Sequence, residues 1–228
     1  MAFVNNAAAV ARTAMQSVDP GLAETYTLLI KFLASFPKAA SAMRGGASAP
    51  AIGSKLYIER QATAFASSRE PRSPKAPATV PDEMVSVILR EYFRFKASDL
   101  DRAKRDHLLS MGAENLVGDL LERYLASILE PRGWLWCSGS TVKAVDFVKA
   151  PAKKGGAWRM LQVKNRDNSE NSSSRAVRLG TDIEKWHRTF AKTQGTNWDA
   201  FPDAELRLQL SETAFKSYVT QYLQTLRA

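Results

Sequence analysis

One turn strongly constrains how the second half of this 228-residue chain can fold. Residues 141–149 and 158–165 are rich in valine and in large apolar side chains, which favours β-strands. The segment Lys153-Lys154-Gly155-Gly156 between them carries the glycines of a tight turn. The pattern therefore predicts an antiparallel hairpin.

The turn also restricts which residues of the hairpin face each other. Facing residues of an antiparallel pair have numbers with a constant sum, 308 for a turn centred on Lys154 and 310 for one centred on Gly155. Either even sum places Asp146, Gln162 and Lys164 on one face, because side chains alternate along a strand. An odd sum would separate Asp146 from the other two. Leu161 and Val163 then point the other way, into the core.

The segments around the hairpin alternate between helical and strand patterns. The clearest helix is 113–130, where apolar residues recur at helical spacing. A capping box at 181–184 predicts a helix through Phe190, and alternating leucines predict a strand at 206–210. The order predicts a mixed central sheet flanked by helices, an α/β (α+β) fold. The remaining expected elements are helices 81–93 and 98–108, strands 134–138, 141–149 and 158–165, and a last helix from Ser211.

Residues 67–81 mark the expected boundary between two domains. Four prolines among small and basic residues leave no room for a regular element there. Before them, residues 4–19 and 22–36 predict helices, whereas 55–66 fits either a helix or a strand. We expect an N-terminal helical region with a Pro-rich linker over 1–80 and a main domain over 81–228.

Composition indicates a soluble globular protein. Hydrophobic residues are 45% and charged residues 24% of the chain, and no apolar run approaches the roughly 20 residues that span a bilayer. We identify no signal peptide. The single cysteine, Cys137, cannot form an intramolecular disulfide. These features fit a reducing, cytoplasmic location.

Positive charge is concentrated around the hairpin. The chain carries 32 Lys and Arg against 23 Asp and Glu, a net charge of +9. Residues 140–193 alone hold 12 basic and 5 acidic residues. This stretch is either a solvated basic face or a phosphate-binding surface.

The acid, amide and lysine of the hairpin favour the second interpretation. A carboxylate, further oxygen ligands and a lysine are the parts of a metal-dependent phosphodiesterase. Asp146 would bind Mg²⁺, which prefers oxygen ligands, and the Gln162 amide and the Val163 carbonyl could add two more. Lys164 would orient or deprotonate a water, or stabilise the phosphorane.

Another carboxylate is expected from the helix 113–130. Glu114 lies at its start, on the edge of the apolar stripe, and is proposed as an additional metal or water ligand. It could equally serve only to stabilise the helix N-terminus. Glu122 points about 130° away from the centre of the stripe and is expected on the surface.

A polar stretch follows the third expected strand. Residues 165–178 are rich in Asn, Ser and Arg, and Asn and Arg read adenine and guanine edges in the major groove. This is a DNA-reading loop or a disordered polar loop. The candidate DNA-binding residues are Lys143, Asn165, Arg166, Asn168, Ser169, Asn171, Ser172, Ser173, Arg175 and Arg178.

Several motifs together resemble the SinI/AvaII-type restriction endonucleases of the PD-(D/E)xK nuclease superfamily. The resemblance is strong over residues 110–203 and looser before them. It is carried by Met111-Gly-Ala-Glu-Asn through Tyr124, Gly133-Trp-Leu-Trp-Cys-Ser-Gly-Ser, Lys143-Ala-Val-Asp-Phe, Leu161-Gln-Val-Lys-Asn-Arg-Asp-Asn-Ser-Glu-Asn-Ser-Ser-Ser and Thr196-Asn-Trp-Asp-Ala-Phe-Pro-Asp.

The resemblance implies a restriction-endonuclease-like core and a Type II enzyme that cuts double-stranded DNA at GGWCC with Mg²⁺. It also implies a homodimer and a partner DNA methyltransferase. Asp146 and Lys164 match the superfamily's Asp and Lys, whereas Gln162 stands where Asp or Glu is usual and Val145 where Pro is common. Two alternatives stay open: a structure- or modification-directed nuclease, and a non-catalytic DNA-binding protein on a degenerate nuclease core.

Overall fold

A four-stranded mixed sheet forms the centre of the molecule. The computed structural model describes residues 2–153, 155–168 and 181–227. Strands β1 (Trp134–Trp136), β2 (Phe147–Lys149), β3 (Arg159–Arg166) and β4 (Ile183–Thr189) lie in that order across the sheet. The first three strands are antiparallel, and β4 runs parallel to β3. The expected mixed sheet flanked by helices is confirmed.

The register of β2 and β3 agrees with the smaller of the two sums allowed by the sequence. Phe147 faces Leu161 and Lys149 faces Arg159, so partner numbers add to 308. Continuing that register by one residue sets Asp146 opposite Gln162. Leu161 and Val163 belong to the apolar core on the opposite face, as expected.

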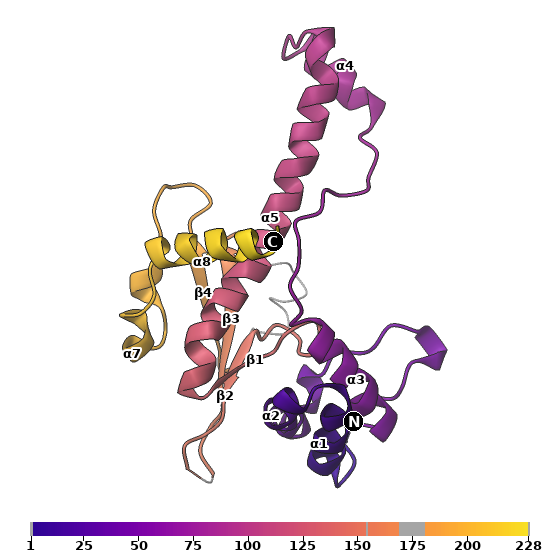
Figure 1. Ribbon diagram of the computed structural model, residues 1–228, viewed down its shortest axis with the longest axis vertical. Helices are drawn as coiled ribbons and strands as arrows, with labels where there is room; N and C mark the ends of the chain where they lie inside the picture. Colours follow the sequence, from indigo (N-terminus) through magenta and orange to yellow (C-terminus); the bar gives the residue numbers. More distant parts are fainter. Residues whose placement is uncertain (1, 154, 169–180, 228) are drawn as a thin grey trace.

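Three N-terminal helices cover one face of the sheet (Figure 1). They are α1 (Ala7–Val18), α2 (Ala23–Ser35) and α3 (Lys55–Ser67), which settles the open question of residues 55–66 as a helix. Ser54 caps α3, because its hydroxyl accepts a hydrogen bond from the Tyr57 N–H. Their buried side chains form one apolar cluster with Leu135, Cys137, Val148 and Met160. The N-terminal helices therefore share a core with the sheet.

The opposite face is covered by the long helix α5 (Leu100–Leu129) and by α8 (Glu212–Thr225). The sequence predicts two helices over 98–130, but α5 is continuous for 30 residues. No proline interrupts this segment, and Gly112 lies inside the helix. A Cβ at Gly112 would lie only 2.6 Å from the Lys75 carbonyl oxygen. Gly112 therefore does not end a helix. It allows the Pro-rich segment to pass close to α5.

Two expected elements after residue 180 are wrong. The segment 181–190 forms β4 rather than a helix, because its backbone pairs with β3 from Met160 through Arg166 and this tertiary pairing overrides the local capping signal. The segment 206–210 is not a strand. Asp203 instead caps the short helix α7 (Ala204–Arg207) by accepting from the Leu206 N–H, which buries Leu206 and leaves Leu208 91% exposed.

A helical arm projects from the body of the molecule (Figure 1). It consists of α4 (Glu83–Glu91) and the first part of α5, reached through the Pro-rich segment, in which the structure places no helix or strand from residue 71 to 82. Ser211 caps α8 as expected. No helix in the described ranges has both the length and the apolar character needed to cross a membrane. The short 3-10 helices are Pro20–Leu22, Pro37–Ala39, Gly46–Ser48, Ala97–Asp99, Glu130–Arg132 and Trp198–Ala200.

Candidate active site

Asp146 is fixed in place by backbone pairing on both sides. It directly precedes β2, its N–H donates to the Leu161 carbonyl at 2.9 Å, and its carbonyl accepts from the Cys137 N–H at 2.8 Å. Its Oδ2 accepts a hydrogen bond from the Val163 N–H at 2.6 Å. Burial raises the pKa of Asp146, while the Lys164 ammonium and the Val163 N–H oppose that rise. The carboxylate is thus held rigidly and is costly to ionise.

Gln162 lies opposite Asp146 in the register and is almost fully buried. It is 1% exposed, and neither its amide oxygen nor its amide nitrogen has a hydrogen-bond partner among the described residues. Buried polar groups are nearly always paired, because an unmade hydrogen bond costs about 1–3 kcal/mol. The Gln162 amide is thus a buried polar group for which the described part of the chain provides no partner.

Lys164 follows two residues later on the same face of β3 and is half-buried. Its positive charge lowers the pKa of Asp146 and that of Glu122. The expected set of Asp146, Gln162 and Lys164 is therefore brought to one face by the register.

Glu122 on α5 is the acid that the sequence interpretation missed. Burial first, and then the negative charge of Asp146, raise the pKa of Glu122 to about 8. Its Oε2 accepts a hydrogen bond from the Trp136 Nε1 at 2.9 Å. The expectation that Glu122 lies on the open surface is wrong.

The error has a physical cause. The periodicity of this helix indicates a single apolar stripe, but its C-terminal half is enclosed on nearly all sides, since even Arg123 and Ala126 are buried. The sheet, α8 and the segment after α3 all contact it. Asp119, Glu122 and Arg123 interrupt the apolar sequence of this half of the helix, so helical periodicity gave no signal that Glu122 is enclosed.

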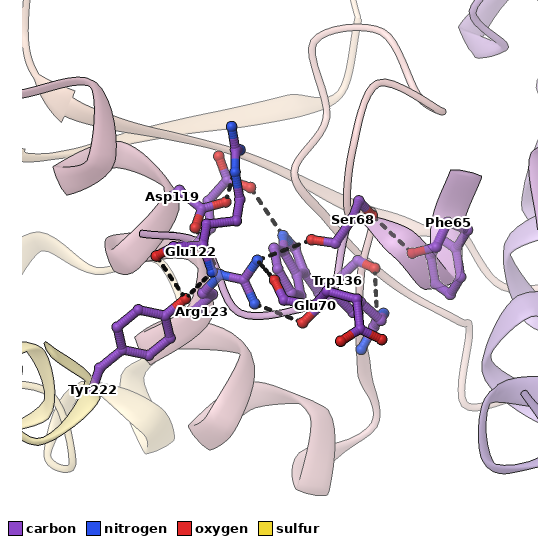
Figure 2. Close-up of polar contacts among 10 residues, drawn as sticks. Phe65, Ser68, Glu70, Asp119, Glu122, Arg123, Trp136 and Tyr222 are labelled. Carbon is purple, nitrogen blue, oxygen red and sulfur yellow. Dashed lines mark hydrogen bonds and ion pairs between the residues drawn. The ribbon is translucent and has the colours of Figure 1, made fainter. Parts of the chain in front are cut away.

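Trp136 donates to Glu122, and the Trp136 ring lies against the guanidiniums of Arg69 and Arg123; Figure 2 shows Glu122, Trp136 and Arg123 together. Arg123 donates to the carbonyls of Ser68, Arg69 and Glu70 at 2.8–3.0 Å and to Asp119 at 2.7 Å. The guanidinium groups of Arg69 and Arg123 lie 5.1 and 5.3 Å from the centre of the Trp136 ring. This network anchors the strand residue that donates to Glu122.

If the site holds the metal ion expected from the sequence, Trp136→Phe should weaken metal-dependent activity. The ring remains for the two guanidiniums, whereas the hydrogen bond to Glu122 is lost. Groups that orient a metal-binding side chain are typically worth about 10- to 100-fold in affinity, so we expect the metal concentration for half-maximal cleavage to rise by roughly that factor. Trp134→Phe is the control, because Trp134 donates instead to Asp203. An equal response of both variants would contradict the role of Trp136.

Glu114 is not brought to this cluster. It is exposed on α5, eight residues before Glu122, which is about 12 Å along a helix axis. Within the described residues, no three His, Cys, Asp or Glu side chains form a group that could hold a metal ion. A metal here would rely on two acids together with neutral oxygen ligands.

The candidate DNA-binding residues are placed only in part. Asn165 is engaged within the fold, since its Oδ1 accepts from the Arg188 Nε at 3.0 Å. Arg166 and Asn168 are exposed at the end of β3, and Lys143 is exposed beside Ala39, whose carbonyl accepts its N–H. Ser169, Asn171, Ser172, Ser173, Arg175 and Arg178 lie outside the described residues.

The mixed sheet carries an acid, an amide and a lysine on one face, and α5, which covers the other face, brings a second acid close enough to interact with Asp146. This is the architecture of a restriction-endonuclease-like enzyme. A family model described as SinI restriction endonuclease matches residues 7–225. The chain belongs to this family.

Two relatives extend the match to nearly the whole chain. The Type II restriction enzyme Eco47I of Escherichia coli is 49% identical over 221 residues, covering 97% of this chain and 96% of that protein. The Type II restriction enzyme SinI of Salmonella infantis is 47% identical over 225 residues, covering 99% of this chain and 97% of that protein.

Proposed function

We propose that this restriction endonuclease hydrolyses phosphodiester bonds of double-stranded DNA with Mg²⁺, at the sequence GGWCC. The cluster of Glu122, Asp146 and Lys164 carries the proposal for the chemistry. The target sequence rests on the resemblance to SinI/AvaII-type enzymes and on the similarity to SinI.

The donor set fits a hard divalent cation. Two neighbouring carboxylates have raised pKa values, and a buried amide oxygen lacks a partner among the described residues. A cation between them would favour ionisation of both acids and satisfy the amide. We assign Asp146, Gln162, the Val163 carbonyl and Glu122 as its ligands, with Glu122 in the role first given to Glu114. Bound Mg²⁺ would supply Lewis-acid chemistry at the phosphate.

The side chains of the cluster would also orient the attacking water and stabilise the transition state. Lys164 donates hydrogen bonds, so its ammonium can orient the attacking water or stabilise the charge that develops on the phosphorane. Asp146, held through the Val163 N–H, keeps a fixed position during these steps. Glu122 is held by Trp136. The site is therefore preorganised before DNA arrives.

The polar stretch 165–178 is proposed to read the bases, with Arg166 and Asn168 at its beginning. The net charge of +9 would attract any DNA without regard to sequence. We further propose a homodimer that cuts both strands, and a partner methyltransferase that protects the same sites.

Incubation with two matched plasmids, one carrying a single GGWCC site and one carrying none, tests the function. We expect Mg²⁺ to give one linear product from the first plasmid and no cut in the second, and EDTA to stop the reaction. Sequencing of the product ends locates the break. Smearing or cleavage at junctions would support the structure-directed alternative, and binding without cleavage the degenerate core.

Gln162→Glu tests the amide as a ligand. A carboxylate binds Mg²⁺ more strongly than an amide, so we expect the Mg²⁺ concentration for half-maximal cleavage to fall several-fold. In EDTA at pH 8 the added charge should lower the Tm, and Mg²⁺ should restore it. Gln61→Glu is the control, because Gln61 is also buried but contacts Tyr57 in the N-terminal core. Unchanged metal dependence would show that Gln162 is not a ligand.

A further inference from the structure

The arm carries an apolar surface that the described part of the chain does not cover. Of the fourteen large apolar side chains exposed in the described residues, ten lie between residues 80 and 111. The other four are scattered over the body. The ten are Val80, Met84, Val85, Val87, Ile88, Tyr92, Phe93, Phe95, Leu109 and Met111. Patches of this kind mark interaction sites.

Helix α4 has apolar residues on two sides. Val85 and Leu89 line a groove of about 480 Å³ between α4 and α5, together with Phe95 and Leu108. Met84, Ile88 and Tyr92 recur every four residues on another side and are 55–79% exposed. A helix that is apolar on two sides is suited to burial between two partners. One partner is α5 of the same chain.

The charge of the arm indicates which kind of molecule could be the second partner of α4. Residues 80–111 hold six basic and six acidic residues and are neutral, so the whole net charge of +9 belongs to the rest of the chain. A neutral apolar surface does not favour DNA, which binds through phosphate contacts. Because the body lacks a comparable apolar patch among its described residues, the surface that best complements one arm is another arm.

We propose that two copies of the chain associate through their arms, with α4 and the N-terminal part of α5 of each copy forming a four-helix bundle. The inference rests on the homodimer put forward above and names its interface. Seven of the ten side chains lie outside the groove between α4 and α5, and they expose on the order of 800 Å² per copy, which is comparable to the area per partner of a standard interface. Two-fold symmetry closes such an assembly at two copies.

Sedimentation of the full chain tests the interface. We expect twice the chain mass of 25.2 kDa for the wild type from roughly 0.1 to 50 µM, a range that brackets micromolar self-association. Met84→Glu with Ile88→Glu should give the single-chain mass, with circular dichroism showing an intact fold. Leu56→Glu with Leu208→Glu is the matched control, since both leucines are exposed on the body. It should remain a dimer.

The possible failures are distinguishable. A wild type that sediments as a monomer throughout would overturn the homodimer as well as its interface, while the cleavage assay would still report the nuclease. A dimeric wild type whose arm variant also stays dimeric would place the interface elsewhere. If the control dissociates as readily as the arm variant, the arm has no special role.

Discussion

Asp146→Asn should abolish DNA cleavage while leaving the fold intact. Asparagine can still accept the Val163 N–H, so the local backbone is preserved, but the negative charge proposed to bind Mg²⁺ is lost. We expect cleavage to fall on the order of 1,000-fold or more, as happens when a group that stabilises the transition state is removed. Single-turnover cleavage of the plasmid with one site measures the loss.

Lys164→Met and Glu122→Gln should also reduce DNA cleavage strongly, because the charges of Lys164 and Glu122 interact with Asp146 in the same cluster. Asp199→Asn and Lys31→Met are the matched controls, since both residues are exposed away from the cluster. The controls should cut at the wild-type rate. Full activity in the Asp146 or Lys164 variant would remove that residue from the catalytic centre.

The second large effect concerns stability without metal. Glu122 has an ordinary pKa of 4.5 that rises to about 8 in the folded chain. Below about pH 4.5, Glu122 is protonated in both the folded and the unfolded chain, so it does not lower the free energy of unfolding. As the pH rises toward 8, the unfolded chain releases the proton more readily than the folded one. The free energy of unfolding therefore falls over this range, and the loss is complete above about pH 8.

Glu122→Gln should remove that loss, because glutamine does not ionise and its amide oxygen can still accept from Trp136. In EDTA at pH 8 we expect the variant to be stabilised by about 4 kcal/mol, or roughly 10 °C in Tm. At pH 5 the difference should nearly vanish. Millimolar Mg²⁺ should raise the Tm of the wild type more than that of the variant. A Tm difference independent of pH would contradict the titration of Glu122.

The hairpin was predictable because its constraints are local. The expected strand 141–149 is a strand only over Phe147–Lys149, and residues 150–158 connect it to β3. The pairing is nevertheless centred on Lys154, as one of the two expected registers has it, and side-chain alternation then decides which residues share a face. Asp146, Gln162 and Lys164 follow from that alone. The parallel strand β4 was not predictable in the same way, since its pairing with β3 depends on contacts across a long connection. A local capping signal indicated the wrong element there.

Glu122 was missed because helical periodicity describes one buried side, whereas this helix is enclosed on several. Its environment depends on Trp136, Arg123 and the backbone after α3, which come together only in the folded chain. The arm was not foreseen either. The sequence predicted a helix over 81–93, but not that its outer side chains remain exposed in the single chain.

Because α5 is continuous, it fixes the distance between the arm and the candidate active site. One unbroken helix carries arm residues such as Leu109 near its beginning and Glu122 near its end, about 20 Å further along the axis. If two copies meet at their arms, this fixed length sets the separation of their two cleavage centres. The stagger between the cuts in the two DNA strands would then depend on the length of this helix.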